Sequence, residues 1–99
     1  MKRILVRYKA KPEAASTNQH LIEKVFDELR SKSPEGVRYL ALRLADGTFV
    51  HFAMTEDGAQ QIPKLDAFAA FQSGIKDRCL EPPQSGDVTI VGNYRMLQE

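Results

Sequence analysis

The apolar and polar residues of this chain recur with two different periods, which predict the order of its elements. Strict alternation predicts strands at Arg3–Lys9 and Asp87–Met96. Apolar residues at helical spacing predict amphipathic helices at Glu13–Lys32 and Leu65–Leu80. Between the helices, Val37–Met54 (VRYLALRLADGTFVHFAM) predicts a β-hairpin, because an Asp-Gly pair between two alternating runs is a strong turn signal.

Proline and aspartate residues predict where the helices begin and end. Pro12 suits the first turn of the first helix, where its missing N–H is not needed. Asp66 is placed to cap the second helix, and Pro82-Pro83 cannot continue it. The order β-α-β-β-α-β predicts an α+β, ferredoxin-like fold, in which a four-stranded antiparallel sheet carries two helices on one face. With 99 residues, the range 1–99 is expected to form a single domain.

The hairpin admits two registers. A two-residue Asp46-Gly47 turn pairs Leu42 with His51, whereas a three-residue loop with Gly47 in a left-handed bulge pairs Leu42 with Val50. Burial favours the bulged register, because it keeps polar groups out of the core. In that register one wholly apolar face is expected to pack against the helices: Leu40, Leu42, Leu44, Val50, Phe52 and Met54.

The opposite face of the sheet is expected to be half apolar and to lack a cover within the chain. It collects these residues: Leu5, Arg7, Tyr39, Ala41, Arg43, Phe49, His51, Ala53, Val91, Asn93 and Arg95. A domain of two layers covers only one sheet face with its own helices. We therefore expect a homodimer in which two such faces enclose a partly polar pocket for a small-molecule ligand.

Several residues of this face are candidates for the site. His51 is the candidate catalytic base, because an imidazole ordinarily exchanges its proton near neutral pH. The alternative is a structural histidine at the dimer contact, hydrogen-bonded to Tyr39 or to a partner residue. As a metal ligand His51 has no second His or Cys at a usable spacing, so no metal is expected.

Ligand binding is assigned to Tyr39, Arg43, Arg7, Asn93 and Phe49. A guanidinium binds a carboxylate or phenolate through two parallel hydrogen bonds, which suits Arg7 or Arg43 to an acidic ligand. The alternative is that these arginines form ion pairs at the rim. Tyr39 and Asn93 would orient the ligand, or would satisfy each other.

Nucleic acid is not an expected partner. The segment Phe49–Phe52 (FVHF) matches part of the third-strand pattern of RNA-recognition folds. However, the basic, glycine and aromatic positions before it are Ala45, Asp46 and Gly47, and Leu5 stands where a second stacking ring belongs. The net charge of +1 also provides no field of basic residues for phosphates.

The remaining composition indicates a cytoplasmic protein with no membrane partner. The N-terminal apolar run, Ile4–Val6, is too short for a signal peptide or a membrane span. Cys79 is the single cysteine, so it cannot form an intrachain disulfide, and it is expected to be a small core residue.

Four segments together resemble a known family: ILVRYKAKPE, YLALRLADGTFVHFAM, LDAFAAFQSGIKDRC, and VTIVGNYRM after the two prolines. The layout is similar to the dimeric α+β barrel superfamily and, within it, to small antibiotic-biosynthesis-monooxygenase-like proteins. The resemblance implies a dimer whose sheets face each other, with a pocket inside the barrel or between each sheet and its helices. The best-understood members oxidise polycyclic phenols with oxygen and use no cofactor, so none is expected here.

The chain also departs from the active members of that family. It contains no tryptophan, which the phenol-oxidising and haem-degrading members use. The predicted second helix has no histidine for haem iron, and Arg7 stands where haem-degrading members place an asparagine. The resemblance therefore implies the fold, the dimer and the place of the pocket, and it assigns no catalytic residue. The expected function is binding of a small aromatic or acidic compound, and the expected activity of an enzyme of this kind is its cofactor-free oxygenation or isomerisation. A non-catalytic dimer that binds a metabolite or a protein is the alternative function.

Overall fold

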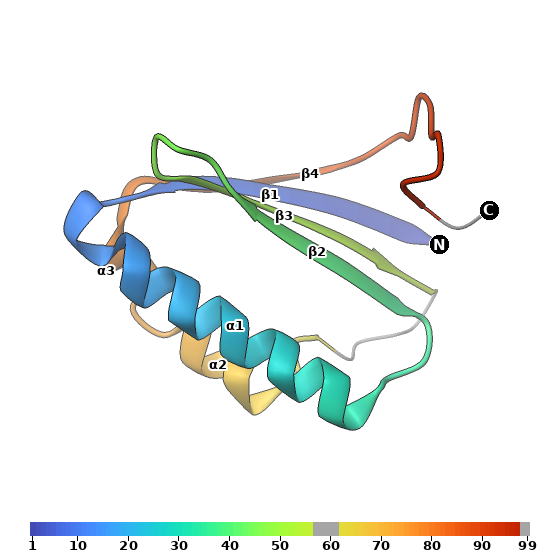
Figure 1. Cartoon of the computed structure of the whole chain (residues 1–99), viewed down its shortest axis with the longest axis horizontal. Coiled ribbons are helices and arrows are strands. Elements are labelled where there is room, and N and C mark those ends of the chain that lie inside the picture. The colour runs from blue at the N-terminus through green and yellow to red at the C-terminus, as the bar shows by residue number, and fades with distance from the viewer. Residues whose placement is uncertain (57–61, 98–99) are drawn as a thin grey trace.

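A computed structural model describes residues 1–56 and 62–97 of the chain, as two layers (Figure 1). The helices all lie on one side of the sheet, and the C-terminal segment extends on the other side. The elements are β1 (Lys2–Ala10), the 3₁₀ turn η1 (Pro12–Ala14), α1 (Ala15–Lys32), β2 (Val37–Arg43), β3 (Thr48–Thr55), α2 (Asp66–Gln72), α3 (Ile75–Arg78) and β4 (Cys79–Asp87). The sequence also predicts a polar connection at Thr55–Lys64, and part of that segment lies outside the described residues.

The sheet confirms the predicted α+β, ferredoxin-like architecture. Its four strands are antiparallel in the order β2-β3-β1-β4, so the first strand lies between the third and the fourth. The core lies between this sheet and the helices, and its buried apolar residues include Tyr8, Val25, Phe49 and Phe71.

The bulged hairpin register is confirmed. Leu42 pairs with Val50, and the Leu44 N–H donates to the Thr48 carbonyl across a three-residue loop. Gly47 has a φ of +90°, which a residue with a Cβ rarely adopts. Asp46 supports the loop, because its Oδ1 accepts a hydrogen bond from the Thr48 N–H at 2.9 Å.

The predicted direction of the two hairpin faces is wrong. Tyr39, Phe49 and His51 lie on the helix side, and His51 is only 5% exposed. Leu40 and Leu42 are instead 43% and 51% exposed on the uncovered side. The sheet therefore turns its polar-containing face inward and leaves Leu40 and Leu42 of its aliphatic face exposed, whereas Met54 on that same face is only 5% exposed, beside the C-terminal segment.

Neighbours from other elements explain this inversion. The prediction assumed that a buried His51 would lack hydrogen-bond partners, which would cost free energy. Both of its ring nitrogens have tyrosine partners, Tyr8 from β1 and Tyr39 from β2. Burial of a polar side chain costs little free energy when its hydrogen bonds are satisfied. The apolar area of the aromatic rings therefore decides which hairpin face packs against the helices.

The predicted second helix, Leu65–Leu80, is two shorter helices. Gly74 has a φ of +78° and interrupts the helix between α2 and α3. Asp66 does not cap α2 with its side chain; instead, Glu28 of α1 accepts hydrogen bonds from the Asp66 and Ala67 N–H groups at 3.3 and 2.8 Å. Pro12 begins η1, just before α1, at a position where a backbone N–H is not needed.

The last strand lies earlier than predicted. Cys79 and both prolines belong to β4, which ends at Asp87, so the predicted strand Asp87–Met96 is wrong. Because α3 ends at Arg78, residues 79–87 pair with the edge of β1, and the Val88 N–H donates to the Arg3 carbonyl just after them. The prolines lie where the β1–β4 register shifts, which an edge strand tolerates.

The conformation of Gly47 leads to a stability prediction. We expect Gly47→Ala to lower the free energy of unfolding by about 1–2 kcal/mol, because the left-handed region penalises a Cβ. Gly92→Ala is the control, because a Cβ there meets nothing within 4 Å and its φ is not in that region. Urea denaturation measures both variants, and equal midpoints would contradict the importance of the bulge.

Candidate functional site

A chain of hydrogen bonds crosses the layer between the sheet and the helices. The Arg78 Nε of α3 donates to the Asn18 Oδ1 of α1 at 3.0 Å, and the Asn18 Nδ2 donates to the Tyr8 hydroxyl at 2.8 Å. The Tyr8 hydroxyl contacts the His51 Nε2 at 2.9 Å, and the Tyr39 hydroxyl contacts the His51 Nδ1 at 2.6 Å. Three strands and two helices therefore converge on one imidazole.

Aromatic rings enclose this chain. Phe71 lies 5.4 Å from the His51 ring and 6.3 Å from the Tyr8 ring, measured between centroids. Phe49 stacks on Tyr8 at 5.6 Å. Asn18 and Tyr8 are 0% and 2% exposed, so the polar groups of this cluster are shielded from water.

A cavity of about 260 Å³ opens beside Tyr39 and His51. Its walls are mostly apolar, and its lining residues are Lys2, Ile4, Val6, Tyr39, His51, Ala53, Thr55, Ile62, Pro63 and Phe68. A smaller cavity of about 80 Å³ shares Val6, Tyr39, His51 and Phe68 and extends to Tyr8 and Phe71. The described residues thus form a largely apolar pocket with a tyrosine–histidine pair in its wall.

Burial controls the protonation of the cluster. It lowers the pKa of His51 to about 4, because the imidazolium form loses its hydration. It raises the pKa of Tyr8 to about 12, although the hydrogen bond from Asn18 opposes that shift. Burial also raises the pKa of Tyr39. At neutral pH all three rings are therefore uncharged, and they act through hydrogen bonds.

Of the predicted site residues, the structure brings Tyr39 and His51 together at the pocket. The hydrogen bond between them is the one expected under the structural alternative for His51. Phe49 is near but lies behind Tyr8, and it is 2% exposed. The proposed mutual contact of Tyr39 with Asn93 is wrong, because Tyr39 bonds to His51 and Asn93 lies in the C-terminal segment.

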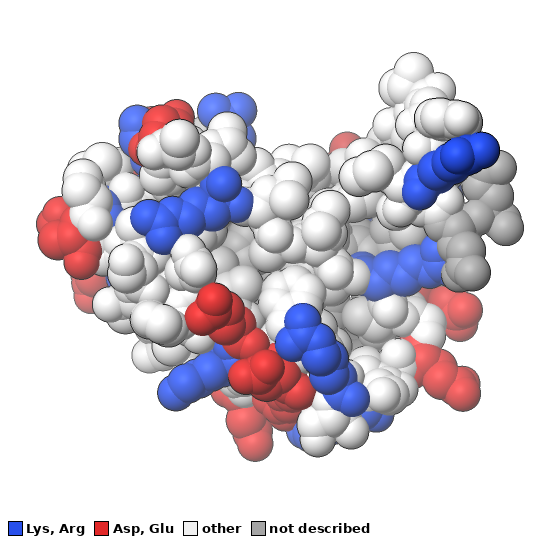
Figure 2. Space-filling model, in the orientation of Figure 1, with Lys and Arg blue, Asp and Glu red and all other residues white. Residues whose placement is uncertain are grey.

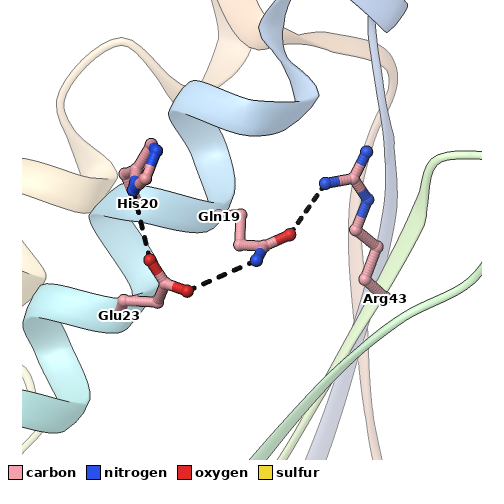
Figure 3. Close-up of polar contacts among 4 residues, drawn as sticks. All are labelled: Gln19, His20, Glu23 and Arg43. Carbon is pink, nitrogen blue, oxygen red and sulfur yellow. Dashed lines mark hydrogen bonds and ion pairs between the residues drawn. The ribbon is translucent and has the colours of Figure 1, made fainter.

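Arg43 belongs to a different hollow, a groove of about 720 Å³ between α1 and β2. Its Nη1 donates to the Gln19 Oε1 at 2.7 Å, and the Gln19 Nε2 donates to Glu23 at 3.3 Å (Figure 3). Glu23 also pairs with the exposed His20 at 3.2 Å. Arg43 is therefore tied to the outer surface of α1 and lies apart from the pocket.

The other predicted ligand-binding residues lie elsewhere. Arg7 alternates with the inward Val6 and Tyr8 on β1 and is exposed on the uncovered face. Asn93 holds a turn in the C-terminal segment, since its Oδ1 accepts from the Leu97 N–H at 2.9 Å. Arg95 lies over the ring of its neighbour Tyr94 at 5.1 Å. These residues do not assemble with His51.

Five residues of the site, Tyr8, Asn18, Phe68, Phe71 and Arg78, are not among the predicted site residues. A signal existed for Asn18, which lies at helical spacing from the buried Ile22 and Val25 on the apolar side of α1. A polar residue in an apolar stripe suggests a buried partner. No comparable signal marked Arg78, because the end of the helix was placed two residues too late.

Comparison with known proteins identifies the class of fold. No family model and no curated protein matches the sequence. Among solved structures, a putative antibiotic biosynthesis monooxygenase from Bacteriodes thetaiotaomicron has a TM-score of 0.79 at 15% identity, over 98% of this chain and 95% of that one. A protein of the same description from Nitrosomonas europaea has a TM-score of 0.75 at 15% identity, over 93% and 100% of the two chains.

A third structure, a variant of SnoaB from Streptomyces nogalater, has a TM-score of 0.66 at 13% identity, over 94% of this chain and 95% of that one. SnoaB is described as a cofactor-independent oxygenase. The chain therefore has the fold of antibiotic-biosynthesis-monooxygenase-like proteins. Identities this low establish the fold alone.

Burial of His51 predicts that stability depends on pH. The unfolded chain protonates this imidazole from about pH 6.5, whereas the folded protein keeps it neutral down to about pH 4. The unfolded state binds more protons between these values, so stability falls as the pH falls through this window, by about 3 kcal/mol in total.

Urea denaturation between pH 7 and pH 4 measures this loss. We expect His51→Gln to flatten the dependence on pH, because the variant has no buried imidazole to protonate. The control is His20→Gln, which changes an exposed histidine of α1 and is expected to retain the wild-type slope. If His51→Gln kept the wild-type dependence of stability on pH, a group other than His51 would be responsible for that dependence.

Proposed function

We propose that the chain binds a small aromatic or acidic compound in the cavity beside Tyr39 and His51, and acts on it as a cofactor-independent monooxygenase. The observation that carries the proposal is a hydrogen-bonded tyrosine–histidine pair in the wall of a largely apolar cavity of about 260 Å³. A space of that size suits a compound of about two fused rings. Lys2, which also lines it, would attract an anionic group.

The proposed reaction needs only the compound and oxygen. A phenol in its keto form carries a ring CH₂, which becomes C=O while the second oxygen atom leaves as water: CH₂ + O₂ → C=O + H₂O. The substrate carbon loses four electrons and the oxygen molecule gains four. His51 would accept at Nε2 the proton that leaves when the electron-rich anion forms, which requires the Tyr8 hydroxyl to release that nitrogen during turnover. The apolar walls would exclude water.

Non-catalytic binding is the second candidate, and the protonation of His51 favours it. An imidazole with a pKa of about 4 holds a proton weakly at neutral pH, which makes it a poor general base. A protein that only binds a metabolite, or a protein partner, would use the same pocket and fold without turnover. Consumption of oxygen separates the two functions.

We also infer that the chain forms a homodimer through the uncovered sheet face, where Leu40, Leu42 and Leu44 are each more than two-fifths exposed. Exposed large apolar side chains that gather on one face are typical of an interface. In Figure 2 charged residues of both signs crowd the helix layer at the bottom of the view. A charged helix layer is less suited to an apolar contact than a face that exposes three leucines.

Two further expectations stay predictions: a single domain over 1–99 and a cytoplasmic location. Within the described ranges, no helix combines the length and apolar character needed to cross a membrane.

The pocket is tested with 1-naphthol as the probe. We expect saturable binding by calorimetry, and Tyr39→Phe to weaken it roughly tenfold, because one hydrogen bond to the naphthol oxygen is lost. Arg43→Gln, outside the cavity, is the control and should bind as the wild type does. Absence of binding to the wild-type protein would contradict the proposed pocket.

Turnover is followed in the same samples with an oxygen electrode. A monooxygenase would convert one naphthol and one O₂ to 1,4-naphthoquinone and one water, and His51→Gln should abolish this conversion. Saturable binding without oxygen consumption would support the non-catalytic function.

The dimer is tested by analytical ultracentrifugation at micromolar concentration. We expect a dimer for the wild type and a monomer for Leu42→Glu, because the substitution buries a carboxylate in the proposed apolar contact. Ala70→Glu adds the same charge to the exposed side of α2 and should leave the dimer intact. A monomeric wild-type protein would sink the proposal.

A further inference from the structure

The hydrogen-bond chain behind the pocket has a direction, and Arg78 sets it. A guanidinium only donates hydrogen bonds, so the Asn18 oxygen must face the Arg78 Nε at 3.0 Å. The amide NH₂ of Asn18 then faces the Tyr8 hydroxyl at 2.8 Å and donates to it. The orientation of the Asn18 amide thus follows from its partner's chemistry.

The direction passes through Tyr8 to His51. The Tyr8 hydroxyl already accepts from Asn18, and its own hydrogen can go only to the His51 Nε2 among the described residues. If Nε2 carried the hydrogen instead, the Tyr8 hydrogen would lack an acceptor in a side chain that is 2% exposed. Such a buried, unsatisfied donor costs free energy, so His51 accepts at Nε2.

The neutral His51 therefore carries its hydrogen on Nδ1 and donates it to the Tyr39 hydroxyl at 2.6 Å. The Tyr39 oxygen is then an acceptor in that bond, and its own hydrogen has no other partner among residues 1–56 and 62–97. Both Tyr39 and His51 line the cavity. The free hydrogen is available to a molecule bound there.

We propose that Arg78 and Asn18 are positioning residues that hold His51 in the Nδ1–H form, so that Tyr39 donates a hydrogen bond into the cavity and selects ligands that carry an acceptor oxygen, such as a ketone or phenolate. The statement about the ligand rests on the proposed pocket, whereas the form of His51 does not. Arg78 is itself anchored, because its guanidinium donates to the Phe71 and Ser73 carbonyls at the end of α2.

A near-isosteric substitution should reverse the direction. In Asn18→Asp the carboxylate still accepts from Arg78, which keeps it ionised, but it cannot donate to Tyr8. Tyr8 would donate to Asp instead and accept from the His51 Nε2–H, and Tyr39 would donate to the Nδ1. The hydrogen that faced the cavity would then be used within the protein.

The form of His51 is measured by ¹⁵N NMR of histidine-labelled protein at pH 7, which distinguishes a protonated ring nitrogen from an accepting one. The chain has only two histidines, so the spectrum contains one other ring, the exposed His20. We expect Nδ1–H in the wild type and Nε2–H in Asn18→Asp. The control Asn93→Asp makes the same change in the C-terminal turn and should keep Nδ1–H.

Ligand selection is measured with two probes that differ by one acceptor, 1-tetralone and its parent hydrocarbon tetralin. The wild type should bind 1-tetralone more tightly than tetralin, and Asn18→Asp should lose roughly tenfold in affinity for 1-tetralone alone. Nε2–H in the wild type would overturn the inference, even if Asn18→Asp fails to fold. Nδ1–H without binding of either probe would refute the pocket and leave the direction of the chain standing.

Discussion

The structure depends on satisfying one buried imidazole. His51 lies on the central strand β3, and its side chain points into the layer where the helices pack. Two tyrosine hydroxyls from the neighbouring strands form hydrogen bonds with its ring nitrogens. Asn18 extends the network to α1, and Arg78 extends it to α3. A partly satisfied network would cost more than an apolar core, so every member holds the others in place. The face that the sheet turns toward its helices follows from this network.

The same network joins stability to function. The rings of Tyr8, Tyr39 and Phe71 pack around His51. The cavity opens beside Tyr39, His51 and Phe68. Burial keeps the imidazole neutral, which makes it a mediator of hydrogen bonds more than a carrier of protons. The outward turn of Leu40 and Leu42 is the other consequence, because the sheet must expose its aliphatic face once its polar face is buried. The pocket and the surface proposed for dimerisation therefore both follow from which face of the sheet packs against the helices.

Pattern and turn chemistry made much of the fold predictable. Alternation located β1 and the hairpin, helical spacing located α1, and Asp46-Gly47 specified the bulged register. The candidate site was predictable in part: Tyr39 and His51 were named, but on the wrong face. Hydrophobicity alone favoured burial of the leucine face over burial of the face that contains His51 and Arg43. It could not include hydroxyls contributed by residues that are distant in the sequence, such as Tyr8, which is 43 positions from His51.

By itself, the sequence determined the order of the elements and the pairing of the hairpin, because both depend on local periods and on one left-handed glycine. Only the tertiary structure decided which hairpin face is buried, because that depends on partners from β1, α1 and α3. It also decided where β4 lies. The β1 edge can pair with one segment, and residues 79–87 reach it first, so the alternating residues after Asp87 are left without a strand to join.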